Sequence, residues 1–380
     1  MRKELSLYLH IPFCKSKCHY CNFVSIVAGE EKMKRYIDSL KKEIEFRAKT
    51  YGAKYDIATI YIGGGTPSLL PEGQIKTLLK TIYTNFNVRG NAEITIEINP
   101  DSLTRGKVDE YLACGINRFS LGLQSSKENL LHLMGRVHTF ETYKSSIQLL
   151  RDRGATNIST DVIIGLPTQT IEDVDQTIKE LTNLQIPHIS CYMLSIEEGT
   201  NFDKLVRNKK LILPSESEVI KQYNKVYKTL DKKGYIRYEI SNFALPGSRS
   251  RHNQVYWDRK PYLGFGVASH SYIDETRLAN TENVDEYIMY IEKNEIPLLM
   301  KEKLTKEDKM DETILLGLRT INGIDTISYE KEFGVSLLAE KKEVIKELIK
   351  DKFLILDADS RLKVTDKGFM VLNRIIEMLI

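Results

Sequence analysis

The 380-residue sequence lacks the marks of membrane, secreted and nucleic-acid-binding proteins. No apolar run approaches the roughly 18 residues of a membrane-spanning helix. The N-terminus, Met1-Arg2-Lys3-Glu4, leads into an apolar segment without a signal-peptide core. Lysine plus arginine number 55 against 52 for aspartate plus glutamate, so no strong basic balance points to nucleic acid. Internal repeats are also missing. These absences favour a globular protein without a membrane span and without a nucleic-acid partner.

Cysteine is scarce, with five residues in the whole chain. Three of them stand close together as Cys14-x3-Cys18-x2-Cys21. Cys114 and Cys191 are isolated, and we expect each to be a small buried apolar side chain. A few clustered cysteines are typical of a reducing compartment, so the sequence predicts a cytoplasmic protein.

The cysteine cluster predicts a metal site. Three thiolates on one short loop can hold three irons of a [4Fe–4S] cluster and leave the fourth iron open to a small molecule. A structural zinc site is an alternative, with His19 as the fourth ligand, but no second CxxC or HxxxH follows. A disulfide is a further alternative, although it would leave an odd cysteine and need an oxidising compartment.

The residues before the cluster narrow the interpretation. With Tyr8-x-His10-Ile11-Pro12-Phe13 in front of it, the cysteine motif resembles the radical S-adenosylmethionine (SAM) superfamily. Within it, the motif is similar to the branch that contains the oxygen-independent coproporphyrinogen III dehydrogenases (HemN) and the HemW haem chaperones. The dehydrogenases carry a fourth cysteine two residues after the third, where this chain has Phe23, and a longer N-terminal extension. Both departures resemble HemW.

This resemblance implies a haem chaperone that binds a [4Fe–4S] cluster and SAM and delivers haem to acceptor haem proteins, respiratory ones among them. It also implies an electron donor for the cluster. The alternative is an enzyme of porphyrin biosynthesis, the coproporphyrinogen III oxidase or dehydrogenase, which decarboxylates its substrate by radical chemistry. The sequence leaves open whether the protein is an enzyme and whether it forms a homodimer.

Apolar runs alternate with helical patterns through the first two thirds of the chain. Six successive βα units predict a parallel sheet with helices outside. Eight units would close a TIM barrel, so six predict a partial (β/α)6 barrel, the fold that the resemblance also implies. The predicted strands cover 5–10, 59–62, 93–98, 118–123, 159–164 and 188–194, and the predicted helices cover 30–49, 71–86, 107–114, 139–153, 171–184 and 215–233.

We expect three segments along the chain. The radical SAM core covers 1–234, and an aromatic- and glycine-rich connecting region without a clear period covers 235–300. A small α+β domain that resembles a winged helix covers 301–380. Its predicted helices are 310–318, 328–333, 339–350 and 368–380, around strands at 352–356 and 361–365. It has no basic stripe, which argues against DNA binding.

Polar residues stand at the ends of the predicted parallel strands, where ligands bind in such folds. Gly63-Gly64-Gly65-Thr66-Pro67 follows the second strand, although a glycine-rich stretch is also compatible with a simple tight turn. Glu97 ends the third strand, and without the resemblance it would be read as a charge facing solvent. Gln124 closes the fourth strand, and Asp161 lies within the fifth.

The resemblance gives these positions roles. It implies that Cys14, Cys18 and Cys21 bind the cluster, with SAM on the fourth iron. The resemblance also implies several contacts with SAM. Backbone groups meet its methionine end, a carboxylate accepts the ribose hydroxyls, and a guanidinium pairs with the SAM carboxylate. Aromatic groups lie near the cluster and the adenine. In this chain these contacts fall on Gly64, Gly65, Thr66, Glu97, Gln124, Arg136, Asp161, Tyr8 and Tyr20.

A later stretch bears on haem. Arg251-His252-Asn253-Gln254-Val255-Tyr256-Trp257 contains the HNxxYW pattern of HemW-like proteins. Histidine is a common haem-iron ligand, so His252 is a candidate ligand. Arg249 and Arg251 are candidates to pair with the propionates. The alternative is that His252 and Trp257 pack the connecting region against the barrel.

Overall fold

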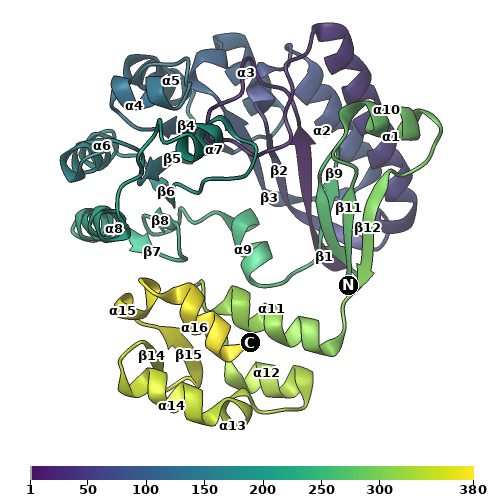
Figure 1. Cartoon of the computed structure of the whole chain (residues 1–380). Coiled ribbons are helices and arrows are strands. Elements are labelled where there is room, and N and C mark those ends of the chain that lie inside the picture. Colours follow the sequence, from purple (N-terminus) through teal and green to yellow (C-terminus); the bar gives the residue numbers. More distant parts are fainter. Residues whose placement is uncertain (1) are drawn as a thin grey trace.

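The computed structural model describes residues 2–380, which form a large curved sheet with helices on its outer face and a smaller unit beside it (Figure 1). The large sheet has 12 strands in the order β12-β11-β10-β9-β1-β2-β3-β4-β5-β6-β8-β7. Its six central strands run parallel to one another. They are β1 (Lys3–Ile11), β2 (Tyr55–Gly64), β3 (Asn87–Ile98), β4 (Arg118–Gln124), β5 (Ile158–Ile164) and β6 (His188–Met193).

A helix follows each of these strands, which confirms the predicted partial (β/α)6 barrel. The helices are α1 (Glu30–Tyr51), α2 (Gln74–Asn85), α3 (Arg105–Ala113), α5 (Phe140–Asp152), α6 (Ile171–Asn183) and α8 (Glu216–Asp231). Two shorter helices, α4 (Glu128–Leu133) and α7 (Asn201–Arg207), were not predicted. Both are six or seven residues long, too short to show a clear helical period in the sequence.

Alternation along the strands separates an apolar outer layer from a polar interior. On β1, Leu5, Leu7 and Leu9 belong to the main hydrophobic core. Ser6 points to the opposite face, where its hydroxyl accepts a hydrogen bond of 2.8 Å from Thr59 on β2. The interior of the barrel is therefore lined by polar side chains, which suits a ligand site at its mouth.

The segment 235–300 contains several short helices and strands, although its sequence shows no clear period. It adds β7 (Ile236–Arg237) and β8 (Asn242–Ala244) beyond β6, and β9 (Tyr262–Phe265), β10 (His270–Ile273) and β11 (Thr276–Asn280) beyond β1. It also contains α9 (Arg251–Trp257) and α10 (Val284–Glu292), and β12 (Leu298–Lys303) ends the sheet. Strands of two to five residues are too short to show an alternating pattern.

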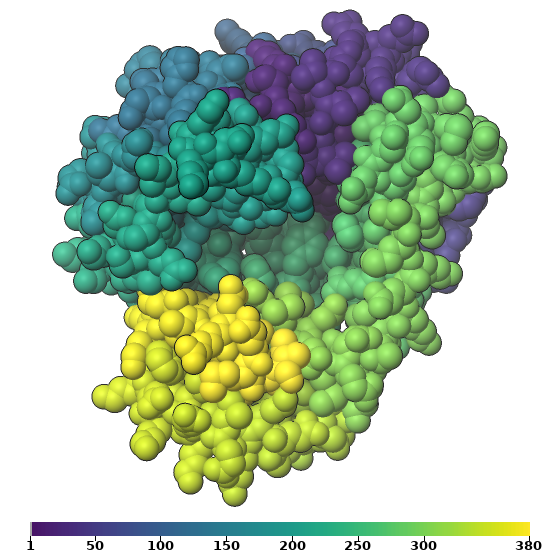
Figure 2. Space-filling model, viewed as in Figure 1, coloured from purple at the N-terminus to yellow at the C-terminus, as the bar shows by residue number. Residues whose placement is uncertain are grey.

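The smaller unit follows β12 and forms the lower part of the surface in Figure 2. It has a hydrophobic core of its own, and its helices and strands confirm a small C-terminal α+β unit. Its sheet has the order β13-β15-β14. The elements are α11 (Lys306–Gly317), β13 (Ile324–Asp325), α12 (Thr326–Phe333), α13 (Leu337–Glu340), α14 (Lys342–Lys350), β14 (Leu354–Leu356), β15 (Arg361–Val364), α15 (Asp366–Phe369) and α16 (Leu372–Leu379). Among residues 2–380, no helix combines the length and apolar character needed to cross a bilayer.

Candidate cofactor site

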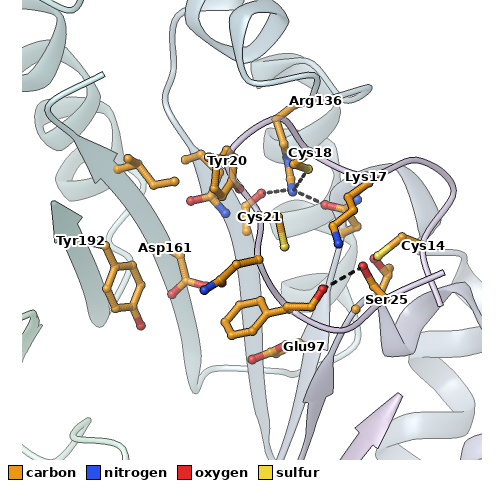
Figure 3. A pocket seen from close by; sticks show the side chains of 18 of the residues that line it. Cys14, Lys17, Cys18, Tyr20, Cys21, Ser25, Glu97, Arg136, Asp161 and Tyr192 are labelled. Carbon is orange, nitrogen blue, oxygen red and sulfur yellow. Dashed lines mark hydrogen bonds between the residues drawn. The ribbon is translucent and has the colours of Figure 1, made fainter. Parts of the chain in front are cut away.

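A cavity of about 450 Å³ opens at the carboxyl ends of the parallel strands (Figure 3). Figure 3 shows the three thiols around one part of the cavity, with Glu97, Asp161 and Tyr192 at other points of its wall. Most of the residues predicted for the cluster and SAM line this cavity: Cys14, Cys18, Tyr20, Cys21, Gly64, Gly65, Thr66, Glu97, Gln124, Arg136 and Asp161. The exceptions are Tyr8 and the haem candidates Arg249, Arg251 and His252.

The cysteine loop is held closed at its base. The backbone N–H of Cys14 donates to the Ile26 carbonyl at 3.0 Å, and Ile26 donates to the Pro12 carbonyl at 2.7 Å. Inside the loop, the N–H of Cys21 donates to the Cys18 carbonyl at 3.2 Å, which makes a turn between these two cysteines. All three cysteines are half-buried free thiols. The loop therefore presents three reduced sulfurs to one cavity.

Two of these sulfurs receive side-chain hydrogen bonds. Thr66 donates from Oγ1 to Cys14 Sγ at 3.6 Å, and the Arg136 guanidinium donates to Cys18 Sγ at 3.5 Å. Burial raises the pKa of the third thiol, Cys21, and the nearby Cys18 and Cys14 add to the rise. A metal that binds the thiolate offsets this cost, since a coordinating thiol is deprotonated. The set of sulfurs and donors fits the thiolate ligands of a [4Fe–4S] cluster.

The zinc alternative finds no fourth ligand in His19. Its Nδ1 lies 2.9 Å from the Leu133 carbonyl, its ring packs against Gly135, and it does not line the cavity. Within residues 2–380, no group of three His, Cys, Asp or Glu side chains converges tightly enough to hold a single metal ion.

The glycine-rich turn after β2 brings backbone to the wall of the cavity. Gly64 has a φ of 112°, which side chains rarely allow. The N–H of Gly65 donates to the Ile11 carbonyl at 2.8 Å, and a Cβ at Gly65 would lie 2.8 Å from the Phe13 carbonyl oxygen. The turn therefore packs directly under the cysteine loop and needs glycine at both positions.

Two carboxyl groups face the cavity, that of Glu97 from β3 and that of Asp161 from β5. Glu97 accepts hydrogen bonds from Tyr61 Oη at 2.8 Å and from the Gly64 N–H at 3.0 Å. Burial raises the pKa of Glu97 to about 7, and burial also raises the pKa of Asp161. Each carboxyl group retains oxygen lone pairs for a ligand, and hydroxyl groups are suitable donors to them.

Arg136 and Gln124 occupy the fourth-strand side of the cavity. Besides Cys18, the Arg136 fork donates to the Gly122 carbonyl at 2.7 Å and to Asn99 Oδ1. In this structure Arg136 thus contacts a predicted cluster ligand and the end of β4. Gln124 has a φ of 71°, a strained value for a residue other than glycine that turns the chain at the end of β4.

Tyr8 and His252 lie away from the cavity. Tyr8 is under the site, where its hydroxyl lies 3.1 Å from His10 Nδ1 and its ring stacks on Tyr61. His252 is only 1% exposed, with Nδ1 2.7 Å from Thr59 Oγ1 and Nε2 2.8 Å from Tyr256 Oη. Burial lowers the pKa of His252 to about 3. The packing alternative accounts for these contacts, and this geometry lends no support to His252 as a haem ligand.

A further part of the cavity wall was not predicted from the sequence. Phe23, which is 62% exposed, stands at its edge on the cysteine loop. Five other residues lie at the carboxyl end of β6 or directly after it, the kind of position from which Glu97 was predicted, but no sequence motif marked them. They are Tyr192, Met193, Leu194, Ser195 and Glu197.

Comparisons with known proteins agree with the fold. Residues 8–181 match the radical SAM superfamily, and residues 304–371 match the HemN C-terminal domain. The chain is 35% identical to "Heme chaperone HemW" of Bacillus subtilis, with 97% of both chains covered. It is also 35% identical to the protein of the same name from Lactococcus lactis, covering 99% of this chain and 97% of the relative. The structure of coproporphyrinogen III oxidase (HemN) from Escherichia coli matches with a TM-score of 0.87 at 26% identity, covering 100% of this chain and 90% of that chain.

Proposed function

Because the chain belongs to the HemW family within the radical SAM superfamily, we propose that it is a haem chaperone that binds a [4Fe–4S] cluster and SAM. One observation supports the cofactor part: the three thiols share a cavity with the glycine turn and with polar groups from the ends of the parallel strands. The names of relatives that match over nearly the whole chain support the haem part. Haem is then cargo, and acceptor haem proteins are partners.

The proposed site divides the work among the residues of the chain. Cys14, Cys18 and Cys21 hold the cluster, and the donors on Thr66 and Arg136 stabilise negative charge on sulfur. Glu97 accepts the ribose hydroxyls of SAM. When bound, cluster and SAM supply one-electron reductive chemistry, for which an electron donor is needed. The protein orients SAM and limits access of water.

We also propose the segment limits 1–234, 235–300 and 301–380 for the core, the connecting region and the C-terminal domain. The separate hydrophobic core after β12 supports the last of these limits. We place the protein in the cytoplasm, because a loop of three free thiols is preserved by reducing conditions.

Cysteine-to-serine variants test the cluster. Anaerobically reconstituted wild type should show broad visible absorbance and bound iron and sulfide, and Cys14→Ser, Cys18→Ser or Cys21→Ser should lose them. Cys114→Ser is the control, because Cys114 does not line the cavity. A triple serine variant that still binds iron and sulfide in stoichiometric amounts would show that the cluster assignment is wrong.

Haem transfer tests the chaperone role. Hemin-loaded protein should pass hemin to an apocytochrome of the b type, detected as the acceptor's absorption spectrum after the two proteins are separated. Free hemin at the same concentration is the control for spontaneous uptake. Hemin that stays on this protein while free hemin loads the acceptor would contradict a delivery role.

Coproporphyrinogen III oxidation is the second candidate, because the likeness to HemN extends over the whole chain. Phe23 opposes it, since an exposed aromatic ring replaces the fourth cysteine of the dehydrogenases. We expect reconstituted protein with SAM, a reductant and coproporphyrinogen III to give no decarboxylated tetrapyrrole. Sustained turnover would make the protein a dehydrogenase.

A further inference from the structure

Helix α9, which carries the HNxxYW pattern, lies between the barrel and the C-terminal unit (Figure 1). It is attached to the two strands that carry the glycine turn and Glu97. The backbone N–H groups of Arg251 and His252 donate to the Glu93 carboxylate on β3 at 3.0 and 2.9 Å. The His252 ring hydrogen-bonds Thr59 on β2 and packs against Tyr61, with ring centroids 5.1 Å apart.

Tyr61 connects this helix to the cofactor cavity. Its hydroxyl donates to Glu97 Oε1 at 2.8 Å, while the Gly64 N–H fixes Oε2 at 3.0 Å. Tyr8 also stacks on the Tyr61 ring, with centroids 6.2 Å apart. The tyrosine ring therefore packs against both Tyr8 and His252, and its hydroxyl and the Gly64 N–H each hold one carboxyl oxygen of Glu97.

We propose that Tyr61 is a positioning residue for SAM: it holds Glu97 in the orientation that receives the ribose hydroxyls. In this arrangement His252 supports Tyr61 by packing against its ring. The inference rests on the proposed SAM site. It assigns the HNxxYW helix to the cofactor site and gives its buried histidine a role other than binding haem iron. When Glu97 is ionised, the Tyr61 hydroxyl donates to a charged acceptor, and such a hydrogen bond is stronger than a neutral one.

The charged and titratable groups around Glu97 determine the expected pH dependence. Tyr61 approaches from β2, the buried Arg118 acts from β4, and Asp161 acts from β5. Burial raises the pKa of Glu97 to about 7, and the hydrogen bond from Tyr61 opposes this rise. Removing the hydroxyl must therefore raise the pKa further. Because the ionised carboxylate is the better acceptor for two hydroxyls, SAM binding should then need a higher pH.

The test is SAM affinity, measured by equilibrium dialysis on cluster-loaded protein between pH 6 and pH 8.5. Tyr61→Phe should bind SAM about tenfold more weakly at pH 7, as expected for loss of a hydrogen bond to a charged group. The midpoint of its pH profile should also lie above that of wild type. Tyr83→Phe is the matched control, because the Tyr83 hydroxyl donates to the Cys114 carbonyl outside the cavity. It should match wild type.

His252→Ala should also weaken SAM binding while hemin affinity stays unchanged. A variant that loses hemin but keeps wild-type SAM affinity would overturn the support role of His252. If Tyr61→Phe equals wild type in both affinity and pH midpoint, the positioning role of Tyr61 is wrong. A wild-type protein that carries the cluster but binds no SAM would instead refute the proposed cofactor site itself.

Discussion

A methyl group added at Gly64 should destabilise the protein through one identifiable contact. A Cβ at this position would lie 2.7 Å from His10 Cε1 and Nδ1. The His10 ring is 4% exposed and is held by Tyr8 Oη at 3.1 Å and by the Val24 carbonyl at 2.9 Å. It therefore cannot move away without breaking buried hydrogen bonds.

Two costs contribute to the loss expected for Gly64→Ala. A side chain at a positive φ costs about 1–2 kcal/mol, and overpacking against a fixed neighbour costs about 1–3 kcal/mol. The free energy of unfolding should therefore fall by about 2–5 kcal/mol. Gly73→Ala is the matched control: its φ is 90°, and a Cβ there meets nothing within 4 Å. It should show only the backbone cost.

Urea unfolding of the two apo variants, followed by circular dichroism, measures the difference. The loss in Gly64→Ala beyond that in Gly73→Ala is the contribution of the contact with His10. When Gly64→Ala is introduced into the His10→Ala variant, much of this excess loss should disappear, because the two sites are coupled. Equal losses in Gly64→Ala and Gly73→Ala would refute the reasoning and leave backbone strain as the sole cause.

Two further predictions concern charged groups. Burial raises the pKa of Glu239 to about 7 in the folded protein. Protonation of Glu239 therefore contributes its full stability below the pKa of the unfolded state, and this contribution is lost as pH rises through 7. The free energy of unfolding of Glu239→Gln, measured in urea, should therefore increase relative to that of wild type by roughly 1–3 kcal/mol between pH 5 and pH 8. A difference that does not change with pH would contradict this. Arg136→Lys loses the fork shared by Cys18 and Gly122, so cluster affinity should fall about tenfold, measured as iron retained against a chelator. Unchanged retention would remove Arg136 as a support of the cluster.

The strand ends explain why so much of the site was predictable. Glu97, Gln124 and Asp161 lie on strands whose carboxyl ends were predicted to within one residue. Once the strands are known to be parallel, their carboxyl ends meet at one edge of the sheet, so these side chains must share a cavity. The cysteine loop joins them because it follows β1 directly.

Register explains what the sequence could not give. Tyr8 is paired with Tyr61 in the sheet, one level below the glycine turn, so it supports the cavity wall without lining it. That position depends on a register shift between Leu5 and Ser6, which no sequence pattern marks. The strands of 235–300 were missed for a related reason, because they are defined by their pairing with neighbouring strands, as β9 pairs with β1 and β8 with β6, and not by their own composition.

The HNxxYW pattern shows why residue type alone does not identify a haem ligand. A pKa of about 3 leaves His252 neutral, and a neutral imidazole can bind iron as well as it can accept a hydrogen bond. Protonation therefore does not separate the two roles, whereas access does. To reach haem, the ring would have to leave Thr59 and Tyr256 unpaired in a buried region, at about 1–3 kcal/mol for each group. Thr59 stands far from His252 in the sequence, so only the fold shows that this histidine holds β2.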